Sequence, residues 1–138
     1  MKDLTSLAKQ IFSADRYATE QTFIEIDKVE QHTCQCRFTL NQQLCNALGT
    51  VMGGALFTLA DFAVAVAANT DEYESNTLHW VSLNANINYL APAKEGVLVA
   101  TASSVHHGRS TALYRTTITR QTDGHIVAIV ETTMIHAR

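Results

Sequence analysis

The 138-residue sequence has few charged residues, a single proline and no low-complexity stretch or internal repeat. Charged side chains make up 17% of the chain and the formal net charge is −3, so a basic nucleic-acid-binding surface is excluded and no nucleic-acid partner is expected. Hydrophobic residues make up 46%, which excludes a disordered chain. The length fits one compact domain over residues 1–138.

The three cysteines are too few, and odd in number, for a disulfide framework. Cys34 and Cys36 lie two residues apart in an alternating segment, which places both thiols on one strand face. No second cysteine pair is present to complete a zinc site. The histidines also lack ligand spacing such as H-x-x-x-H; they are residues 32, 79, 106, 107, 125 and 136. We therefore expect no metal, no cofactor and free thiols in a reducing, cytoplasmic environment.

One hydrophobic run, from Val51 to Ala68, approaches the length of a membrane span, and Thr58 and Asp61 are its only polar side chains. The central carboxylate, a glycine pair and several weakly hydrophobic alanines argue against a membrane span, and no Lys/Arg cluster flanks the run. The N-terminus also lacks the continuous hydrophobic run of a signal peptide. The sequence predicts a core helix over about 52–68, hydrophobic on all sides and enclosed by protein, with no membrane association.

The remaining periodicities predict the order of the other elements. Spacing of i, i+3, i+4 and i+7 from Leu4 predicts a short amphipathic helix over about 3–14. The segment 22–40 has strand character with a polar break at 27–31. Four β-type runs follow the long helix, over about 80–90, 96–107, 110–121 and 125–136, and short turn-like links between them favour antiparallel hairpins. A curved antiparallel sheet wrapped around one central helix, an α+β fold, accommodates this order.

Asp61 is a single carboxylate in the middle of the hydrophobic helix. Burying an unpaired charge costs roughly several kcal/mol, so such a group is paired, protonated or in chemical use. The structural interpretation is a partner from a core Arg or Lys, or the capping of a backbone amide. The functional interpretation is a general base or nucleophile with a perturbed pKa in a cleft. The helix composition alone leaves both open.

The pair Gly53-Gly54 falls in the first turn of the same helix. Backbone N–H groups there have no intrahelical partner, and a glycine lets a ligand oxygen approach closely, as an oxyanion site requires. The alternative is that the glycines only permit a tight turn and close packing. Gly53 and Asp61 are eight residues apart, about 12 Å along one helix, which is too far to share one carbonyl. If both serve one site, Asp61 of one subunit faces Gly53 of another, which predicts an oligomer.

These residues belong to a longer pattern. The segment Asn46-x-x-Gly49-x-x-Met52-Gly53-Gly54-x-x-x-x-Leu59-Ala60-Asp61 resembles the Asn-x-x-Gly-x-x-His-Gly-Gly…Leu-x-Asp motif of hotdog thioesterases of the phenylacetyl-CoA thioesterase type. Segment 81–93 is similar to that family's strand after the helix, and 107–110 to its later hairpin with a Gly-Lys/Arg pair. The resemblance covers about residues 20–136. It implies a hotdog fold and hydrolysis of an acyl-CoA thioester to a free acid and CoA.

The resemblance also implies a role for individual residues. Asp61 would be the nucleophile or general base, Gly53 the donor of the oxyanion amide, Asn46 a positioning group for substrate or water, and Ser82 the residue that completes the site. The implied substrate-binding residues are Met52, Gly54, Gly108 and Arg109, with Arg109 near the CoA phosphates or pantetheine arm. The implied partners are the acyl-CoA substrate and further copies of the chain, in a homodimer or homotetramer with inter-subunit active sites.

Met52 departs from the pattern, because the family has a histidine at this position. If that histidine polarises the thioester, the chain lacks one polar group of the site. A non-catalytic acyl-CoA-binding hotdog module is therefore one alternative. An acyl-thioester dehydratase is another, although that chemistry normally needs a histidine paired with the helix carboxylate. Hydrolysis remains the prediction because Asp61 and both glycines are present.

Overall fold

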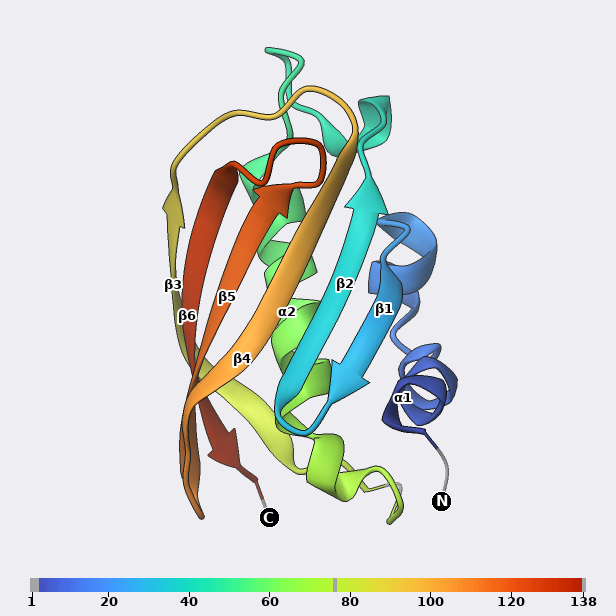
Figure 1. Cartoon of the computed structure of the whole chain (residues 1–138), viewed down its shortest axis with the longest axis vertical. Helices are drawn as coiled ribbons and strands as arrows, with labels where there is room; N and C mark the ends of the chain where they lie inside the picture. Colours follow the sequence, from blue (N-terminus) through green and yellow to red (C-terminus); the bar gives the residue numbers. More distant parts are fainter. Residues whose placement is uncertain (1–2, 76, 138) are drawn as a thin grey trace.

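The computed structural model describes residues 3–75 and 77–137, and Figure 1 shows six strands curved around one central helix. The helix α2 spans Gly53–Ala68 and the N-terminal helix α1 spans Leu4–Phe12. The strands are β1 (Glu25–Glu30), β2 (Thr33–Thr39), β3 (Trp80–Tyr89), β4 (Val97–His107), β5 (Thr111–Arg120) and β6 (Ile126–His136). Three short helical turns join them, η1 (Tyr17–Gln21), η2 (Gln42–Leu44) and η3 (Thr70–Glu72). The predicted element order is confirmed.

The six strands form one sheet in the order β1-β2-β4-β5-β6-β3, and every neighbouring pair is antiparallel. The sheet wraps around α2, with α1 and η1 beyond the β1 edge (Figure 1). The predicted α+β class and hotdog arrangement are confirmed. Because α2 lies inside the curve, its residues face the inner side of several strands at once.

The end of α2 is fixed to the start of β3 by Asn69. The amide nitrogen of Asn69 donates to the carbonyl oxygens of Ala65, at 2.9 Å, and Trp80, at 3.2 Å. Its side-chain oxygen accepts from the Trp80 N–H at 3.0 Å. Asn69 thus ends the helix, satisfies a buried strand terminus and sets how β3 runs back along α2.

The core lies between α2 and the inner face of the sheet. Cys34 and Cys36 are both buried on this face, together with Phe38, as their alternation predicts. The Cys36 thiol points at the helix and lies 3.8 Å from the carbonyl oxygen of Leu59. All three cysteines are free, with Cys45 half-buried.

Protein does not enclose α2 on all sides, and this part of the prediction is wrong for a single chain. One stripe is uncovered: Gly54, Phe57 and Asp61 are exposed, and Thr58 and Ala65 are half-buried. The stripe follows i, i+3, i+4, i+7 and i+11, which is one face of a helix. It carries no polar side chains other than Thr58 and Asp61, so it lacks the composition of an ordinary solvent-facing stripe.

The strand β3 is also open. It is an edge strand, paired only with β6, and Trp80 is its one buried residue among ten. Large hydrophobic side chains on it are exposed, with Val81 at 49% and Leu83 at 60%. An edge of this length with exposed hydrophobic side chains is a template for pairing with another chain.

One predicted boundary is wrong. The polar break expected at 27–31 is part of β1, which continues to Glu30, and the reversal occurs at Gln31 and His32. His32 adopts the left-handed conformation with φ 57°. Polar residues are tolerated within β1 because it is the other edge strand. In the described part of the chain, no helix has both the length and the hydrophobicity of a membrane span.

Candidate active site

Asp61 projects from the middle of α2 toward the start of β3. The Ser82 hydroxyl donates to its Oδ1 at 3.4 Å and also lies 3.4 Å from the Met134 sulfur. The expectation that Asp61 is fully buried is wrong for the single chain, in which the residue is exposed. Partial burial nevertheless raises the pKa of Asp61, and the opposing effect of the Ser82 hydrogen bond is smaller. Asp61 and Ser82, both predicted site residues, are thus together.

The surroundings of Asp61 include a segment that no sequence motif marks. Asp61 lines a pocket of about 290 Å³ together with the end of the α1–η1 link and the start of η1. The lining residues from that segment are Asp15, Arg16, Tyr17 and Ala18. Burial and the negative charge of Asp61 both raise the pKa of Asp15. A second carboxylate therefore lies close enough to Asp61 to interact with it electrostatically.

Gly53 lies in a different pocket, under Tyr89 at the far end of β3. The Tyr89 hydroxyl donates to the Gly53 carbonyl at 3.4 Å, and a Cβ added at Gly53 would meet the Tyr89 ring at 3.0 Å. Both residues line a pocket of about 430 Å³ with Leu56 and Pro92. At Gly54, by contrast, an added Cβ has nothing within 4 Å. Within one chain, Gly53 and Asp61 therefore line separate pockets.

Asn46 and Met52 belong to the loop that leads into α2. The Asn46 side-chain oxygen accepts from the Leu48 N–H at 3.0 Å and from the Thr50 N–H and hydroxyl, both at 3.2 Å. Asn46 thus organises this loop through its side-chain oxygen. The side-chain nitrogen of Asn46 is then the group for the predicted contact with substrate or water. Met52 precedes the helix, is 53% exposed and makes no side-chain capping hydrogen bond. An apolar side chain thus lies beside the open N–H groups of the first helical turn.

Gly108 and Arg109 form the turn between β4 and β5. The Gly108 N–H donates to the Thr111 carbonyl at 2.9 Å, and an added Cβ would lie 2.8 Å from that oxygen, so only glycine fits. Arg109 is exposed at the tip. The turn adjoins the Trp80 end of β3, since the His136 N–H donates to Ser110 and His136 pairs with Trp80. Gly53 contacts the Tyr89 end, roughly 30 Å away along the strand.

Comparison with known proteins identifies the family. Residues 48–127 match the model of the thioesterase superfamily, a range that includes Gly53, Asp61, Ser82 and Arg109 but not Asn46. The chain belongs to the thioesterase superfamily. It is 33% identical over 99 residues to acyl-coenzyme A thioesterase PaaI of Escherichia coli, covering 71% of this chain and 67% of that protein. The predicted family resemblance is confirmed.

Solved structures agree with the sequence match. The E. coli PaaI structure matches with a TM-score of 0.83 and 27% identity over 98% of this chain and 96% of that one. A hypothetical thioesterase of Streptococcus pneumoniae, solved with coenzyme A, matches with a TM-score of 0.79 and 29% identity, covering 93% and 95%. A putative esterase of Deinococcus radiodurans is 34% identical over 92 residues, 66% of this chain and 59% of that protein. The sequence match thus spans little more than half of that esterase.

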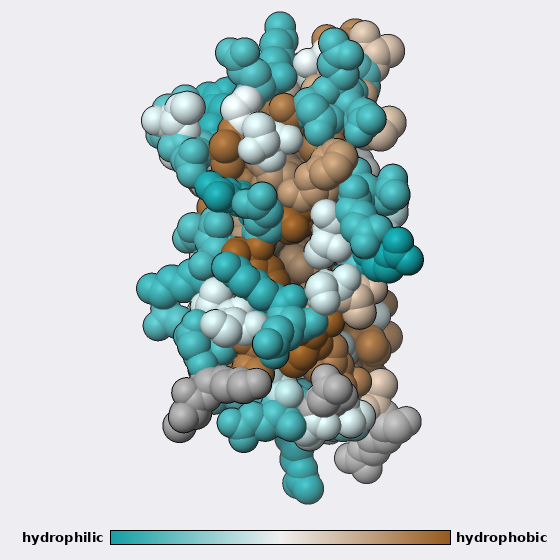
Figure 2. All heavy atoms as spheres, turned by 90° about the vertical axis from the view of Figure 1, so that its right-hand side faces the viewer, coloured by the Kyte–Doolittle hydropathy of each residue, from teal (hydrophilic) through white to brown (hydrophobic). Residues whose placement is uncertain are grey.

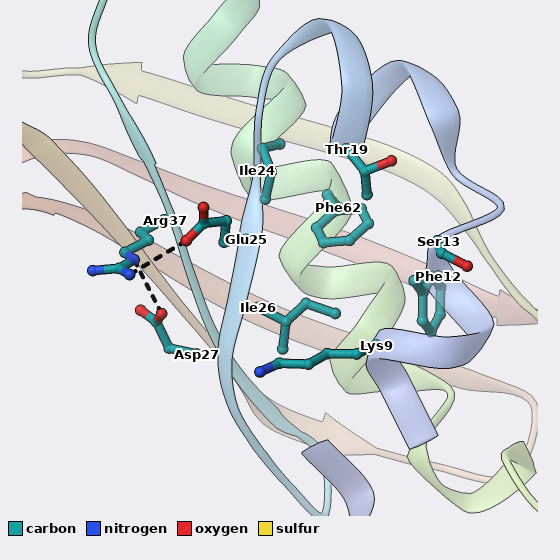
Figure 3. A pocket seen from close by; sticks show the side chains of 10 residues that line it. All are labelled: Lys9, Phe12, Ser13, Thr19, Ile24, Glu25, Ile26, Asp27, Arg37 and Phe62. Atoms are coloured by element: carbon teal, nitrogen blue, oxygen red, sulfur yellow. Dashed lines mark hydrogen bonds and ion pairs between the residues drawn. The ribbon is translucent and has the colours of Figure 1, made fainter. Parts of the chain in front are cut away.

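A further pocket lies between α1 and β1. On this side of the molecule, hydrophobic residues are visible in hollows between hydrophilic side chains (Figure 2). The pocket has a volume of about 410 Å³, and Phe12, Ile24, Ile26 and Phe62 form its apolar part (Figure 3). Arg37 lies at its edge, paired with Glu25 at 3.3 Å and with Asp27 at 3.2 Å.

Phe62 connects this pocket to the surroundings of Asp61. It follows Asp61 in α2 and lines both the pocket under α1 and the pocket that contains Asp61. Its ring contacts Phe12 edge-on at a centroid distance of 5.9 Å. The N-terminal segment therefore shapes the space on both sides of Phe62, although no motif marks it.

Proposed function

We propose that this thioesterase hydrolyses an acyl-CoA thioester to a free acid and CoA, with Asp61 as nucleophile or general base. The observation that carries the proposal is the partly desolvated Asp61 carboxylate, held by Ser82 at the edge of a pocket. A raised pKa makes a carboxylate a stronger base than a surface aspartate. The 33% identity to acyl-coenzyme A thioesterase PaaI supports an acyl-CoA thioester as the substrate.

Two routes use the same carboxylate. In the first, Asp61 attacks the thioester carbonyl, the CoA thiolate leaves and takes a proton, and water hydrolyses the resulting mixed anhydride. In the second, Asp61 takes a proton from water, the hydroxide attacks the carbonyl, and the CoA thiolate leaves and takes that proton. Both routes develop negative charge on the carbonyl oxygen. In our proposal, the backbone N–H of Gly53 at the helix N-terminus stabilises this negative charge.

The Gly53 amide and Asp61 of one site come, in our proposal, from different subunits. Within one chain they are about 12 Å apart along α2 and line separate pockets. The uncovered stripe of α2 and the exposed edge strand β3 support a second copy packed against this side. Pairing of β3 with its copy would cover both, and would bring the Gly53 end of one subunit toward Asp61 of the other.

The binding of CoA follows from the same arrangement. Arg109 is an exposed cation roughly 30 Å from Gly53 of its own chain, so it would serve a site shared with another subunit. A phosphate contact from an exposed arginine suits the charged end of CoA. The acyl group would enter beside Asp61 and Phe62, where the two pockets offer hydrophobic walls.

A panel of acyl-CoAs of differing chain length and aromaticity tests the proposal by thiol release. We expect turnover of at least one member without added metal, and loss of that turnover in Asp61→Asn. If no member is cleaved while acyl-CoA still binds, the chain is a binding module, the alternative that Met52 favours. Release of water rather than thiol from a 3-hydroxyacyl-CoA would indicate the dehydratase instead.

A further inference from the structure

Two groups of histidines and carboxylates gather at the end of the molecule where α2 ends. In the described residues, one group is Glu72, His79 and His136, and the other is His32, Asp71 and His107; in each, one potential ligand atom per residue lies within 4.8 Å of the others. None of these residues lines the pocket that contains Asp61. The sequence predicts no metal site because its histidines lack ligand spacing, and His136 lies 64 residues from Glu72.

Glu72 is the centre of the first group. Its Oε2 lies 3.0 Å from His79 Nδ1 and its Oε1 lies 3.1 Å from His136 Nε2, so each carboxylate oxygen faces one imidazole nitrogen. Partial burial raises the pKa of Glu72, but the hydrogen bonds from the two histidines outweigh it and the pKa is lowered. Both oxygens of the Glu72 carboxylate are therefore already directed at imidazole nitrogens.

The two histidines are held in place by the sheet. His136 pairs with Trp80 across β3 and β6, and the Ala137 N–H donates to the His79 carbonyl at 2.7 Å. The two imidazole rings lie 4.8 Å apart, and the Trp80 ring packs edge-on against His136 at 5.1 Å. Glu72, from η3, approaches both from the helix side. A site whose ligands are fixed by packing loses little conformational freedom on binding an ion.

The spacing of these groups suits a small transition-metal ion. Bonds of about 2.0–2.1 Å in tetrahedral geometry place ligand atoms roughly 3.3 Å apart. The oxygen–nitrogen distances are 3.0 Å to Oε2 and 3.1 Å to Oε1 of Glu72, and one ligand atom of each residue lies within 4.8 Å of the others, so the side chains close in on an ion by rotation without a change of the backbone. The side chains are 18%, 33% and 27% exposed for Glu72, His79 and His136, which leaves access for the ion and a water ligand.

The second group is less suited to hold an ion. His32 and His107 are stacked nearly parallel, with centroids 3.8 Å apart and planes 13° apart. The rings of His79 and His136 are also stacked, but less closely, with centroids 4.8 Å and planes 23° apart. In addition, His107 Nδ1 is engaged outside its group, with the Tyr114 hydroxyl at 2.8 Å.

We propose that Glu72, His79 and His136 bind one divalent first-row transition-metal ion, with Zn²⁺ as the ion best suited to two imidazoles and a carboxylate. The ion would be coordinated by His79 Nδ1, His136 Nε2 and a Glu72 oxygen, with water in the fourth position. Each neutral imidazole then carries its proton on the other ring nitrogen, and a protonated histidine releases a proton as the ion binds. The ion would join η3, the start of β3 and the end of β6, so its effect is on stability.

Metal-free protein titrated with Zn²⁺ in a calorimeter tests the site. We expect one ion per chain, affinity lowered at least about 100-fold by His79→Gln or His136→Gln, and little change with Mg²⁺. At a free Zn²⁺ concentration about 100 times Kd, the wild-type melting temperature should rise by roughly 5–10 °C, and the variants should show no such rise. Co²⁺ gives an absorption spectrum that reports tetrahedral coordination.

Three control variants separate this site from other metal-binding groups. His125→Gln removes an exposed turn histidine, Cys45→Ser removes the half-buried thiol, and His32→Gln removes a member of the second group. All three should keep wild-type affinity. Metal-free melts show whether each variant is folded. The proposal would be overturned if a control variant lost affinity while the folded His79 and His136 variants kept it. It would also be overturned if the wild type bound no ion, and the three residues would then be only a hydrogen-bonded carboxylate–histidine cluster.

Discussion

The Ser82 hydroxyl on β3 donates a hydrogen bond of 3.4 Å to Asp61 on α2. This contact joins the central helix to the edge strand at the point where protein covers neither completely. Burial raises the pKa of the Asp61 carboxylate, which lies beside hydrophobic side chains that are exposed in the single chain. A carboxylate with a raised pKa and an uncovered hydrophobic stripe of α2 thus occur at the same place.

Replacing Asp61 by Asn should reduce kcat by roughly 10²–10⁴-fold, because the side chain keeps its shape but loses its base and nucleophile. Acyl-CoA affinity should change far less, since the carboxylate acts on the transition state. Thiol-release kinetics and calorimetric binding measure the two effects. Glu74→Gln, which removes an exposed carboxylate, is the control and should keep wild-type turnover.

The same variant has a predictable pH dependence of stability. The folded-state pKa of Asp61 is raised above its unfolded value of about 3.9, so its contribution to stability is fully present below that value and is lost as the pH rises through the folded pKa. Asp61→Asn should therefore melt higher than wild type at pH 7, and the difference should vanish near pH 3. A variant that melts lower at pH 7 would identify Asp61 as a paired structural carboxylate.

Gly53 and Gly54 provide a matched pair of substitutions. A side chain at Gly53 meets Tyr89 and crowds the amide, whereas one at Gly54 has open space. Gly53→Val should lower kcat by at least about tenfold, by analogy with the loss of an oxyanion donor. Gly54→Val has the same helix-propensity cost, but it should keep most of the wild-type kcat. Any effect of this substitution should be on KM. Equal loss of kcat in both would contradict the role of the Gly53 amide.

Arg109 should act on CoA binding and not on the chemical step. Arg109→Ala is expected to raise KM with kcat nearly unchanged, the pattern for lost uniform binding. The increase should shrink as salt rises, because screening weakens the wild-type contact. Arg120→Ala, at the end of β5, is the control and should leave KM unchanged. A large fall in kcat at unchanged KM would show that the assigned role is wrong.

The exposed side of β3 should form a subunit interface. Leu83→Lys places a charge on a residue that is 60% exposed in the single chain and would be buried against a second copy. Sedimentation should show a dimer or tetramer for wild type and for Thr122→Lys, which adds the same charge in an exposed turn, and a shift toward monomer for Leu83→Lys. Active wild-type monomer at the assay concentration would exclude a shared site.

The sequence was sufficient to predict the order of the elements and a grouping that includes Asp61 and Ser82, but not the surface of α2. Helix ends, strands and the isolated Asp61 are local signals, since each depends on neighbours a few residues away. Hydrophobic residues covered by a second chain have the same composition as those covered by their own chain. The periodicity therefore predicted a fully enclosed helix where the structure has an open stripe at Phe57 and Asp61.

Other features depend on contacts between distant segments, which spacing does not reveal. Tyr89 covers Gly53 only because β3 runs back along α2. Asp15 adjoins Asp61 because η1 packs beside the helix, and nothing in its own segment indicates this. Glu72 and His136 are 64 residues apart in sequence yet are hydrogen-bonded. A prediction from one sequence has no signal for such pairs.

Complementation between two inactive variants tests the shared site most directly. Asp61→Asn and Gly53→Val proteins, each nearly inactive, are mixed in equal amounts, dissociated and reassembled. If each site takes Asp61 from one subunit and Gly53 from the other, half of the dimers are mixed and each has one intact site, so about a quarter of the wild-type activity should return. Activity that stays at the sum of the two variants, although mixed dimers have formed, would contradict the account.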